Sequence, residues 1–156
     1  MRSRAIDRPV GTATPSSPGA PKRGGWLRTV ARIALGAALL FAGISHLTVA
    51  RSEFRAQVPA WVPLDEDFVV LASGVVEIAL GAGLVALPRY RVLIGCLTAA
   101  FFVAVFPGNV SQWLTQTSAF GLDTDRARLV RLFFQPLLVL WALWSTGVIG
   151  RRRSPR

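Results

Sequence analysis

The chain of 156 residues contains only one cysteine and one histidine. The single cysteine, Cys96, rules out an intramolecular disulfide and a Cys-x-x-Cys redox pair. A protein that moves electrons through its own thiols is therefore disfavoured, and Cys96 is predicted to fill space in a helix. The sequence shows no haem-ligand pair and no flavin-binding pattern, so no cofactor is evident from it.

Acidic residues are also scarce. The chain has eight Asp and Glu residues and 18 Lys and Arg residues, which gives a net charge of +10. The basic residues gather before residue 29 and after residue 150, whereas a DNA-binding domain places them on a folded face. The sequence therefore argues against nucleic acid as a partner. Basic tails beside apolar runs instead indicate membrane topology, helped by anionic lipid.

Hydrophobic residues are abundant, at 52% of the chain with a mean hydropathy of +0.46. Long apolar runs occupy residues 29–49, 68–87, 92–106 and 129–149. Each run is long enough to cross a bilayer as a helix, and the third is predicted to continue past Pro107 toward Trp113. We predict an all-α integral membrane protein, an antiparallel four-helix bundle. The alternative, a soluble bundle, needs polar helix faces that these runs lack.

The domain organisation follows from composition. Residues 1–27 are rich in Pro, Ser, Thr, Gly and Arg without a hydrophobic period, which predicts a disordered basic tail. Residues 28–150 form the predicted membrane domain, and residues 151–156 form a second basic tail. The small residues at 48–50 have the spacing of a signal-peptide cleavage site. A retained span is favoured, because the preceding apolar run is long and carries His46.

Arginine and lysine in the short loops set the predicted orientation. Both tails and the PRYR turn at 88–91 are basic, whereas acidic residues balance or exceed the basic ones in the loops at 51–67 and 111–128. We therefore predict both termini in the cytoplasm and a multi-pass location in the bacterial cytoplasmic (inner) membrane. The aromatic residues expected at the two interfaces are Trp61 and Trp113 outside, and Trp26 and Tyr90 inside.

Glu77 stands in the middle of the second run, roughly 13 Å below its start at the helical rise per residue. A charge at the centre of a bilayer costs roughly 3 kcal/mol on insertion scales, so such residues face the bundle interior and pair. Gly74 and Gly81 share the helical face of Glu77, and Gly36 and Gly43 repeat the spacing on the first run. These four glycines are predicted to be packing residues between two antiparallel helices.

Each of the four runs carries polar residues at a similar depth. The predicted set is His46, Glu77, Asn109, Arg131 and Gln135. We predict that they line a ligand-binding pocket that opens toward the outside. The alternative is interhelical glue, with a Glu77–Arg131 salt bridge and hydrogen bonds worth about 0.6 kcal/mol each. Proton transfer through the His, Glu and Arg groups is a weaker hypothesis. A metal site is disfavoured, because His46 and Glu77 supply only two ligands.

Five stretches of the chain, in order, resemble the DoxX family of small four-helix bacterial membrane proteins. The stretches read FAGISHL, SEFRAQVPAWVP, SGVVEIALGAGLVALPRYR, AVFPGNV and RLFFQPLLVLWALW. The resemblance covers about residues 28–144 and implies a four-helix bundle with both termini in the cytoplasm. In one departure, Phe133 stands where the last motif of the family has proline, and Pro136 follows the glutamine. This departure leaves the local geometry of the fourth predicted helix open.

The resemblance also implies a function class. Members are linked to thiosulfate:quinone oxidoreduction or oxidative-stress complexes, and more distant relatives bind sterol-like ligands. We therefore expect a quinone-like ligand and a role as membrane subunit or anchor of such a complex. The expected partners are the bilayer, a redox protein and a second copy of the chain. No self-contained catalytic motif is present, so catalytic residues stay unassigned. The alternatives are a structural scaffold and, less favoured, a small transporter.

Overall fold

The computed structural model describes residues 23–118 and 124–150. Most of the predicted N-terminal tail and the whole C-terminal tail lie outside these residues. The long helices are α1 (Arg23–Leu47), α3 (Glu66–Ala86), α4 (Arg91–Leu114) and α5 (Asp125–Thr146), joined by the short helix α2 (Arg51–Arg55) and the 3-10 turn η1 (Pro88–Tyr90). No strand occurs within the described part of the chain. All four long helices have the length and apolar composition to cross a membrane, which confirms the predicted helix class.

Local sequence signals explain where the helices begin and end. The side chain of Asp65 accepts a hydrogen bond from the backbone N–H of Phe68 at 2.9 Å and so caps the start of α3. Thr124 caps α5 in the same way through the N–H of Ala127, at 3.2 Å. Gly147, with a φ of 84°, ends α5 in the left-handed conformation that glycine adopts without strain. Helix α4 continues past Pro107, as predicted, and α5 continues through Pro136.

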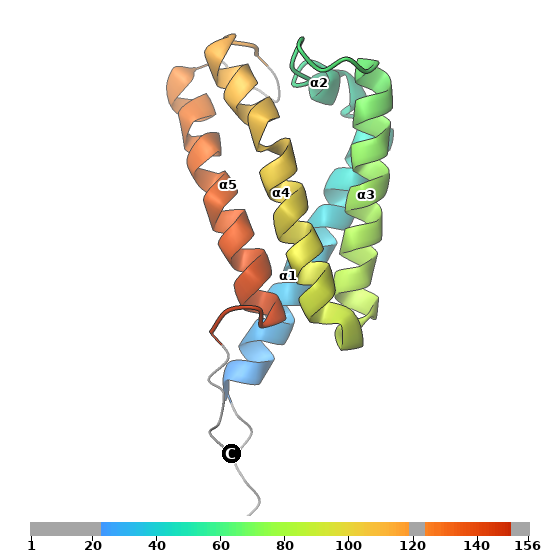
Figure 1. The fold of residues 1–156 in the computed structure, drawn as a ribbon, viewed down its shortest axis with the longest axis vertical. Coiled ribbons are helices and arrows are strands. Elements are labelled where there is room, and N and C mark those ends of the chain that lie inside the picture. The colour runs from blue at the N-terminus through green and yellow to red at the C-terminus, as the bar shows by residue number, and fades with distance from the viewer. Residues whose placement is uncertain (1–22, 119–123, 151–156) are drawn as a thin grey trace, which may run out of the picture.

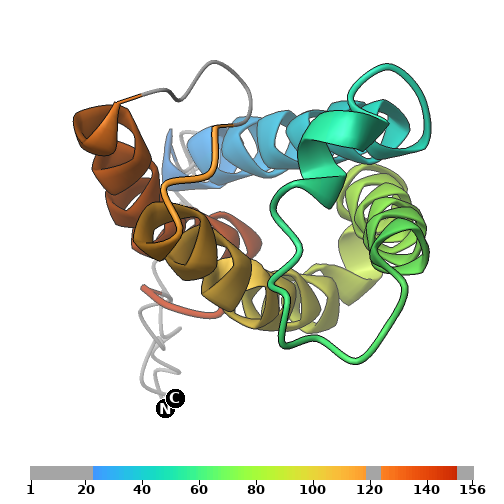
Figure 2. The same cartoon turned by 90° about the horizontal axis from the view of Figure 1, so that it is seen from above.

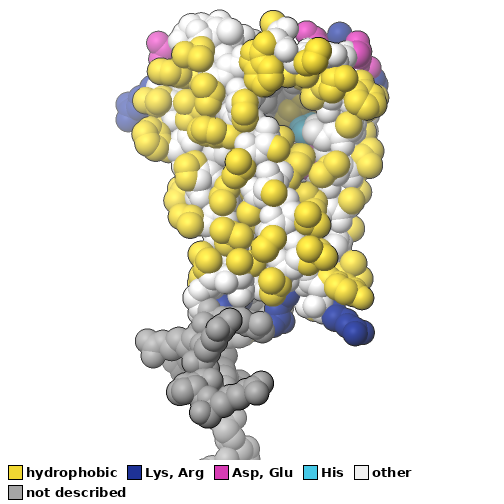
Figure 3. Space-filling view, viewed as in Figure 1, with side chains coloured by type: hydrophobic (Ala, Val, Ile, Leu, Met, Phe, Trp, Pro, Cys, Tyr) yellow, Lys and Arg dark blue, Asp and Glu magenta, His cyan; other side chains and the backbone are white. Residues whose placement is uncertain are grey.

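The helices run alternately up and down, and each packs against the next around a ring in the order α1, α3, α4, α5 (Figures 1 and 2). The start of α1, the η1 turn and the end of α5 lie at one end of the bundle. Helix α2 lies at the opposite end, beside the upper parts of α1 and α3. Between the two ends the surface drawn in Figure 3 is largely hydrophobic, and acidic side chains appear only at the α2 end.

Helices α1 and α3 touch backbone to backbone at the glycines that the sequence singled out. A Cβ built on Gly43 would lie 2.6 Å from the carbonyl oxygen of Gly74, and one built on Gly81 would lie 2.7 Å from that of Gly36. Real Cβ atoms do not approach that closely, so a side chain at either position would push the helices apart. The close contact of α1 and α3 therefore depends on these glycine pairs.

The hydrophobic core fills the half of the bundle near η1. Its buried members come from the middle of α1, the end of α3, the first half of α4 and the end of α5. They are Leu35, Leu39, Leu84, Ile94, Ala99, Phe102 and Ala142. A cavity adjoins this core on the side nearer α2, and Leu35, Leu39 and Phe102 of the core form part of its wall.

Candidate functional site

A cavity of about 470 Å³ lies among the four long helices. Each of the four helices contributes to its wall, and residues 57–59, 61 and 62, which follow α2, contribute at the α2 end. Figure 3 shows a hollow in the molecular surface near that end, with the single histidine of the chain visible inside it. The volume falls within the range of small-molecule sites, and most of the lining is apolar.

The five residues predicted as ligand-binding all lie on the wall of this cavity. They are His46 from α1, Glu77 from α3, Asn109 from α4, and Arg131 and Gln135 from α5. All of these except Arg131 are buried, and Arg131 is half-buried. The structure therefore brings together, from four helices, side chains that are separated by as many as 89 positions in the sequence (135 minus 46).

His46 and Glu77 form a contact between α1 and α3. Nδ1 of His46 lies 3.1 Å from Oε2 of Glu77 and 3.3 Å from Oγ of Ser73, one helical turn before Glu77. The ring of Phe54, from α2, stands nearly perpendicular to the imidazole, with ring centroids 3.4 Å apart. The imidazole is thus held between α2 and α3, with its Nδ1 beside the carboxyl group of Glu77.

Arg131 extends across the cavity to two amide side chains. Its guanidinium donates to Oε1 of Gln57 at 2.8 Å and to Oε1 of Gln112 at 3.3 Å. Gln57 lies after α2 and Gln112 lies near the end of α4, so one arginine ties three segments together. A guanidinium suits this role because its donors point in several fixed directions.

Asn109 and Gln135 form a second interhelical link, deeper in the bundle. Nδ2 of Asn109 donates to Oε1 of Gln135 at 3.0 Å, and Nε2 of Gln135 donates to the backbone carbonyl of Phe102 at 2.6 Å. Phe102 precedes the residue whose carbonyl loses its helical donor to Pro107. The Gln135 amide therefore anchors α5 to α4 beside the proline turn.

Two polar atoms on the cavity wall have no hydrogen-bond partner among the described residues. They are Oε2 of Glu77 and Nε2 of Gln57, and both are buried. Oε2 of Glu77 is within ion-pair distance of His46, but the contact does not have hydrogen-bond geometry. A buried polar atom without a partner costs about 1–3 kcal/mol. These atoms therefore mark the positions at which a bound molecule would gain most from polar contacts.

Sequence reasoning missed three residues at this site: Gln57, Ser73 and Gln112. Ser73 precedes Glu77 by one turn and Gln112 follows Asn109 by one turn, so helical spacing was a usable signal for both. Gln57 lies outside the long helices, where no periodicity indicates which side chains point inward. Gln57 lines the cavity because the chain that follows α2 crosses this end of the bundle.

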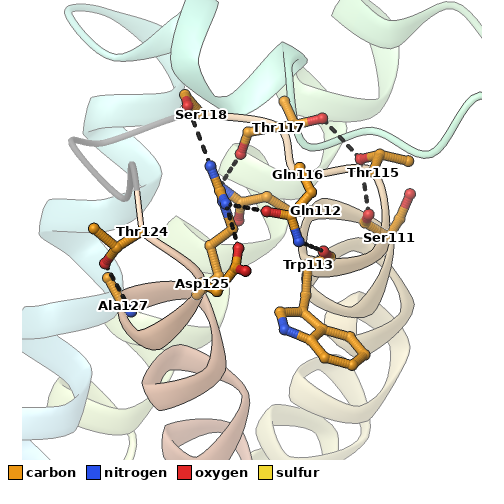
Figure 4. A network of polar contacts seen from close by, with 11 residues as sticks. Ser111, Gln112, Trp113, Thr115, Gln116, Thr117, Ser118, Thr124, Asp125 and Ala127 are labelled. Carbon is orange, nitrogen blue, oxygen red and sulfur yellow. Dashed lines mark hydrogen bonds and ion pairs between the residues drawn. The ribbon is translucent and has the colours of Figure 1, made fainter.

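Sequence reasoning also treated Arg128 as a loop charge. The structure buries it at the start of α5, where it donates to Oε1 of Gln116 at 2.7 Å and to Asp125 at 3.0 Å (Figure 4). It also donates to Oγ of Ser118 at 3.2 Å. Gln116 adopts a positive φ of 56°, and its own amide donates to the carbonyl of Trp113. This network fixes the end of α4 to the start of α5, outside the cavity wall.

Removing the Asn109 amide is expected to destabilise the fold. We expect Asn109→Leu to lower the free energy of unfolding by about 1–3 kcal/mol, because Oε1 of the buried Gln135 loses its donor. A double-mutant cycle with Gln135→Leu, followed by circular dichroism in a denaturing-detergent titration, is expected to give a coupling of about 0.6–1.7 kcal/mol. Additive effects of the two substitutions would contradict a direct link.

A family model matches residues 35–146, which is well over half of the chain. The chain belongs to the family described as Domain of unknown function (DUF8561). The DUF8561 match begins within α1 and ends with α5, and it includes every residue that lines the cavity. No curated protein and no solved structure matched the chain.

Proposed function

We propose that the chain is a multi-pass protein of the bacterial cytoplasmic membrane. The four long apolar helices support insertion. The charge distribution supports the orientation, because the tails and the η1 turn are basic and the turn lies at the end of the bundle where α1 starts and α5 ends. By the positive-inside rule this end faces the cytoplasm, and α2 with the cavity half of the bundle faces outward.

Cysteine labelling tests this orientation. In a Cys96→Ser background, Ser52→Cys in α2 is expected to react with a membrane-impermeant maleimide added to spheroplasts. Arg89→Cys in η1 is expected to react only after permeabilisation. Both positions are exposed in the structure, so burial does not limit the reaction. The reverse labelling pattern would contradict the proposed topology.

We propose further that the cavity binds a small lipophilic molecule with a polar head, of the quinone type. The supporting observation is that two buried atoms on the wall of a mostly apolar cavity, Oε2 of Glu77 and Nε2 of Gln57, have no hydrogen-bond partner among the described residues. A quinone carbonyl accepts a hydrogen bond and a quinol hydroxyl donates one, so such a ring can satisfy both types of group. The resemblance to the DoxX family supports the same ligand class.

The proposed role is that of membrane subunit or anchor for an oxidoreductase or oxidative-stress complex. Reduction of a quinone to a quinol takes two electrons and two protons. The sequence shows no redox-active cysteine pair or haem-ligand pair, so a partner protein would deliver the electrons. His46 and Glu77, in contact at 3.1 Å, are placed to exchange protons with the bound head.

A structural scaffold is the second candidate function. The favourable observation is that the amides of Asn109 and Gln135 are already satisfied by one another and by Phe102, without any ligand. The scaffold account explains this link and the contacts of Arg131 with Gln57 and Gln112. A scaffold gives no role to the atoms of Glu77 and Gln57 that lack a hydrogen-bond partner, whereas a bound ligand would supply those partners.

A fluorescence titration separates the two candidates. Trp61 and Trp141 line the cavity, so a quinone bound there is expected to quench tryptophan emission. A short-chain benzoquinone added to protein in mild detergent is expected to give saturable quenching. Free tryptophan in the same detergent serves as the control for collisional quenching. Quenching that rises without saturation, as it does for free tryptophan, would favour the scaffold.

A further inference from the structure

Helices α3 and α4 touch near η1, the chain after α2 reaches α4 at the other end, and a hollow lies between these two contacts. Near η1 the helices touch, since a Cβ built on Gly83 would lie 3.0 Å from Cδ1 of Ile94. At the other end, residues after α2 reach α4, where a Cβ built on Gly108 would lie 3.3 Å from the carbonyl oxygen of Gln57. In Figure 1 the two helices diverge from η1 toward α2, and Figure 3, from the same side, shows the hollow in this region.

The residues that face one another across this gap are small or apolar. Val105 lies eleven residues beyond Ile94, or about three helical turns, and so shares the face of α4 that meets α3. Val69 and Ser73 line the cavity from α3, and Val105 and Gly108 line it from α4. No charged residue of the described chain lines the cavity from α4, and Glu77 is the one that does so from α3. The gap therefore connects the cavity with the apolar side of the bundle.

The α2 end, by contrast, is partly roofed. The chain after α2 swings across this end toward α4 before it returns to α3 (Figure 2). Residues 57–59, 61 and 62 from this stretch form part of the cavity wall, and the guanidinium of Arg131 is bonded to Gln57 beneath it. A molecule that entered along the bundle axis would have to displace this segment, whereas one that entered between α3 and α4 would meet apolar side chains.

We propose that the cavity is loaded sideways from the bilayer, and that its ligand is an amphiphile whose long apolar chain leaves through the gap between α3 and α4. This inference rests on the proposed binding of a quinone-type head. A cavity of about 470 Å³ has the size of sites for drug-sized molecules, so it holds a ring but not a long isoprenoid chain. With the head between Glu77 and Gln57, the gap is the apolar exit for such a chain.

The test compares a tailless dimethoxybenzoquinone with a long-chain ubiquinone in wild-type protein and two variants. Val105→Trp places an indole in the gap. Val103→Trp places the same side chain on the same helix at an exposed position that does not line the cavity. We expect Val105→Trp to weaken binding of the long-chain quinone at least tenfold and to change binding of the tailless one less than threefold. Val103→Trp is expected to change neither.

Several results would overturn the inference. One is unchanged binding of the long-chain quinone to Val105→Trp, and another is an equal loss of both ligands, which would place the effect in the pocket rather than the gap. A wild-type protein that binds the tailless quinone but not the long-chain one would overturn the sideways route and leave the proposed function intact. A wild-type protein that binds neither would overturn both.

Discussion

Gly43→Ala is expected to destabilise the protein by about 2 kcal/mol, within the range for overpacking a close contact. The added Cβ would lie 2.6 Å from the carbonyl oxygen of Gly74 and 3.0 Å from the backbone nitrogen of Ile78. These are backbone atoms, so no side-chain rotation relieves the clash, and α1 must move away from α3. A denaturing-detergent titration followed by circular dichroism measures the change in free energy of unfolding.

Gly25→Ala is the matched control for this substitution. Gly25 also lies in α1, but a Cβ built there meets nothing within 4 Å. Alanine is the better helix former, so this variant is expected to be as stable as the wild type or slightly more so. The double variant Gly43→Ala with Gly74→Ala is expected to be less destabilised than the sum of the single variants, because both force apart the same helices. A Gly43→Ala protein as stable as Gly25→Ala would contradict the close helix contact.

Glu77→Ala is expected to weaken binding of a short-chain benzoquinone by about 10- to 100-fold. A buried polar group of the ligand that loses its hydrogen-bond partner costs about 1–3 kcal/mol, and each 1.4 kcal/mol is a factor of ten in the dissociation constant. Glu77→Gln keeps the shape and one acceptor oxygen, so its loss is expected to be smaller. The quenching of cavity-lining tryptophans gives the dissociation constant for each variant.

Thr98→Val is the matched control for Glu77. Thr98 is fully buried on α4, but its hydroxyl bonds the carbonyl of Ile94 and it does not line the cavity. Its replacement removes a buried polar group without touching the proposed site, so the dissociation constant is expected to stay the same. If folded Glu77→Ala protein binds the quinone as tightly as Thr98→Val does, the polar wall of the cavity has no part in binding.

The long helices were predictable because run length and helical spacing are local properties. The spacing placed Gly74, Glu77 and Gly81 on one face, and the structure buries all three where α3 meets α1. It also placed Arg131 and Gln135 on one face of α5, one turn apart. Their partners differ: Arg131 donates to Gln57 after α2, and Gln135 donates to the backbone of Phe102 in α4. These partners depend on how the helices are arranged in space, which helical spacing alone does not indicate.

The features that could not be predicted from the sequence lie in or beside the segments that connect the long helices. Helix α2 has only five residues and no apolar period, so nothing in its composition separates it from a loop. Gln57 could not be predicted for the same reason, because the direction of its side chain depends on where α2 packs. Arg128 could not be predicted as buried for another reason. One of its partners, Gln116, adopts a positive φ, and a non-glycine residue gives no sequence signal for that conformation.

Native mass spectrometry from a mild detergent shows directly whether the cavity holds a lipophilic molecule. We expect wild-type protein with the added mass of one bound ligand, and loss of that mass in Glu77→Ala protein but not in Thr98→Val protein. The same spectra report the number of chains and any partner subunit. Folded wild-type protein that has the bare mass of the chain, even after addition of a saturating short-chain quinone, would show that the cavity binds no such molecule.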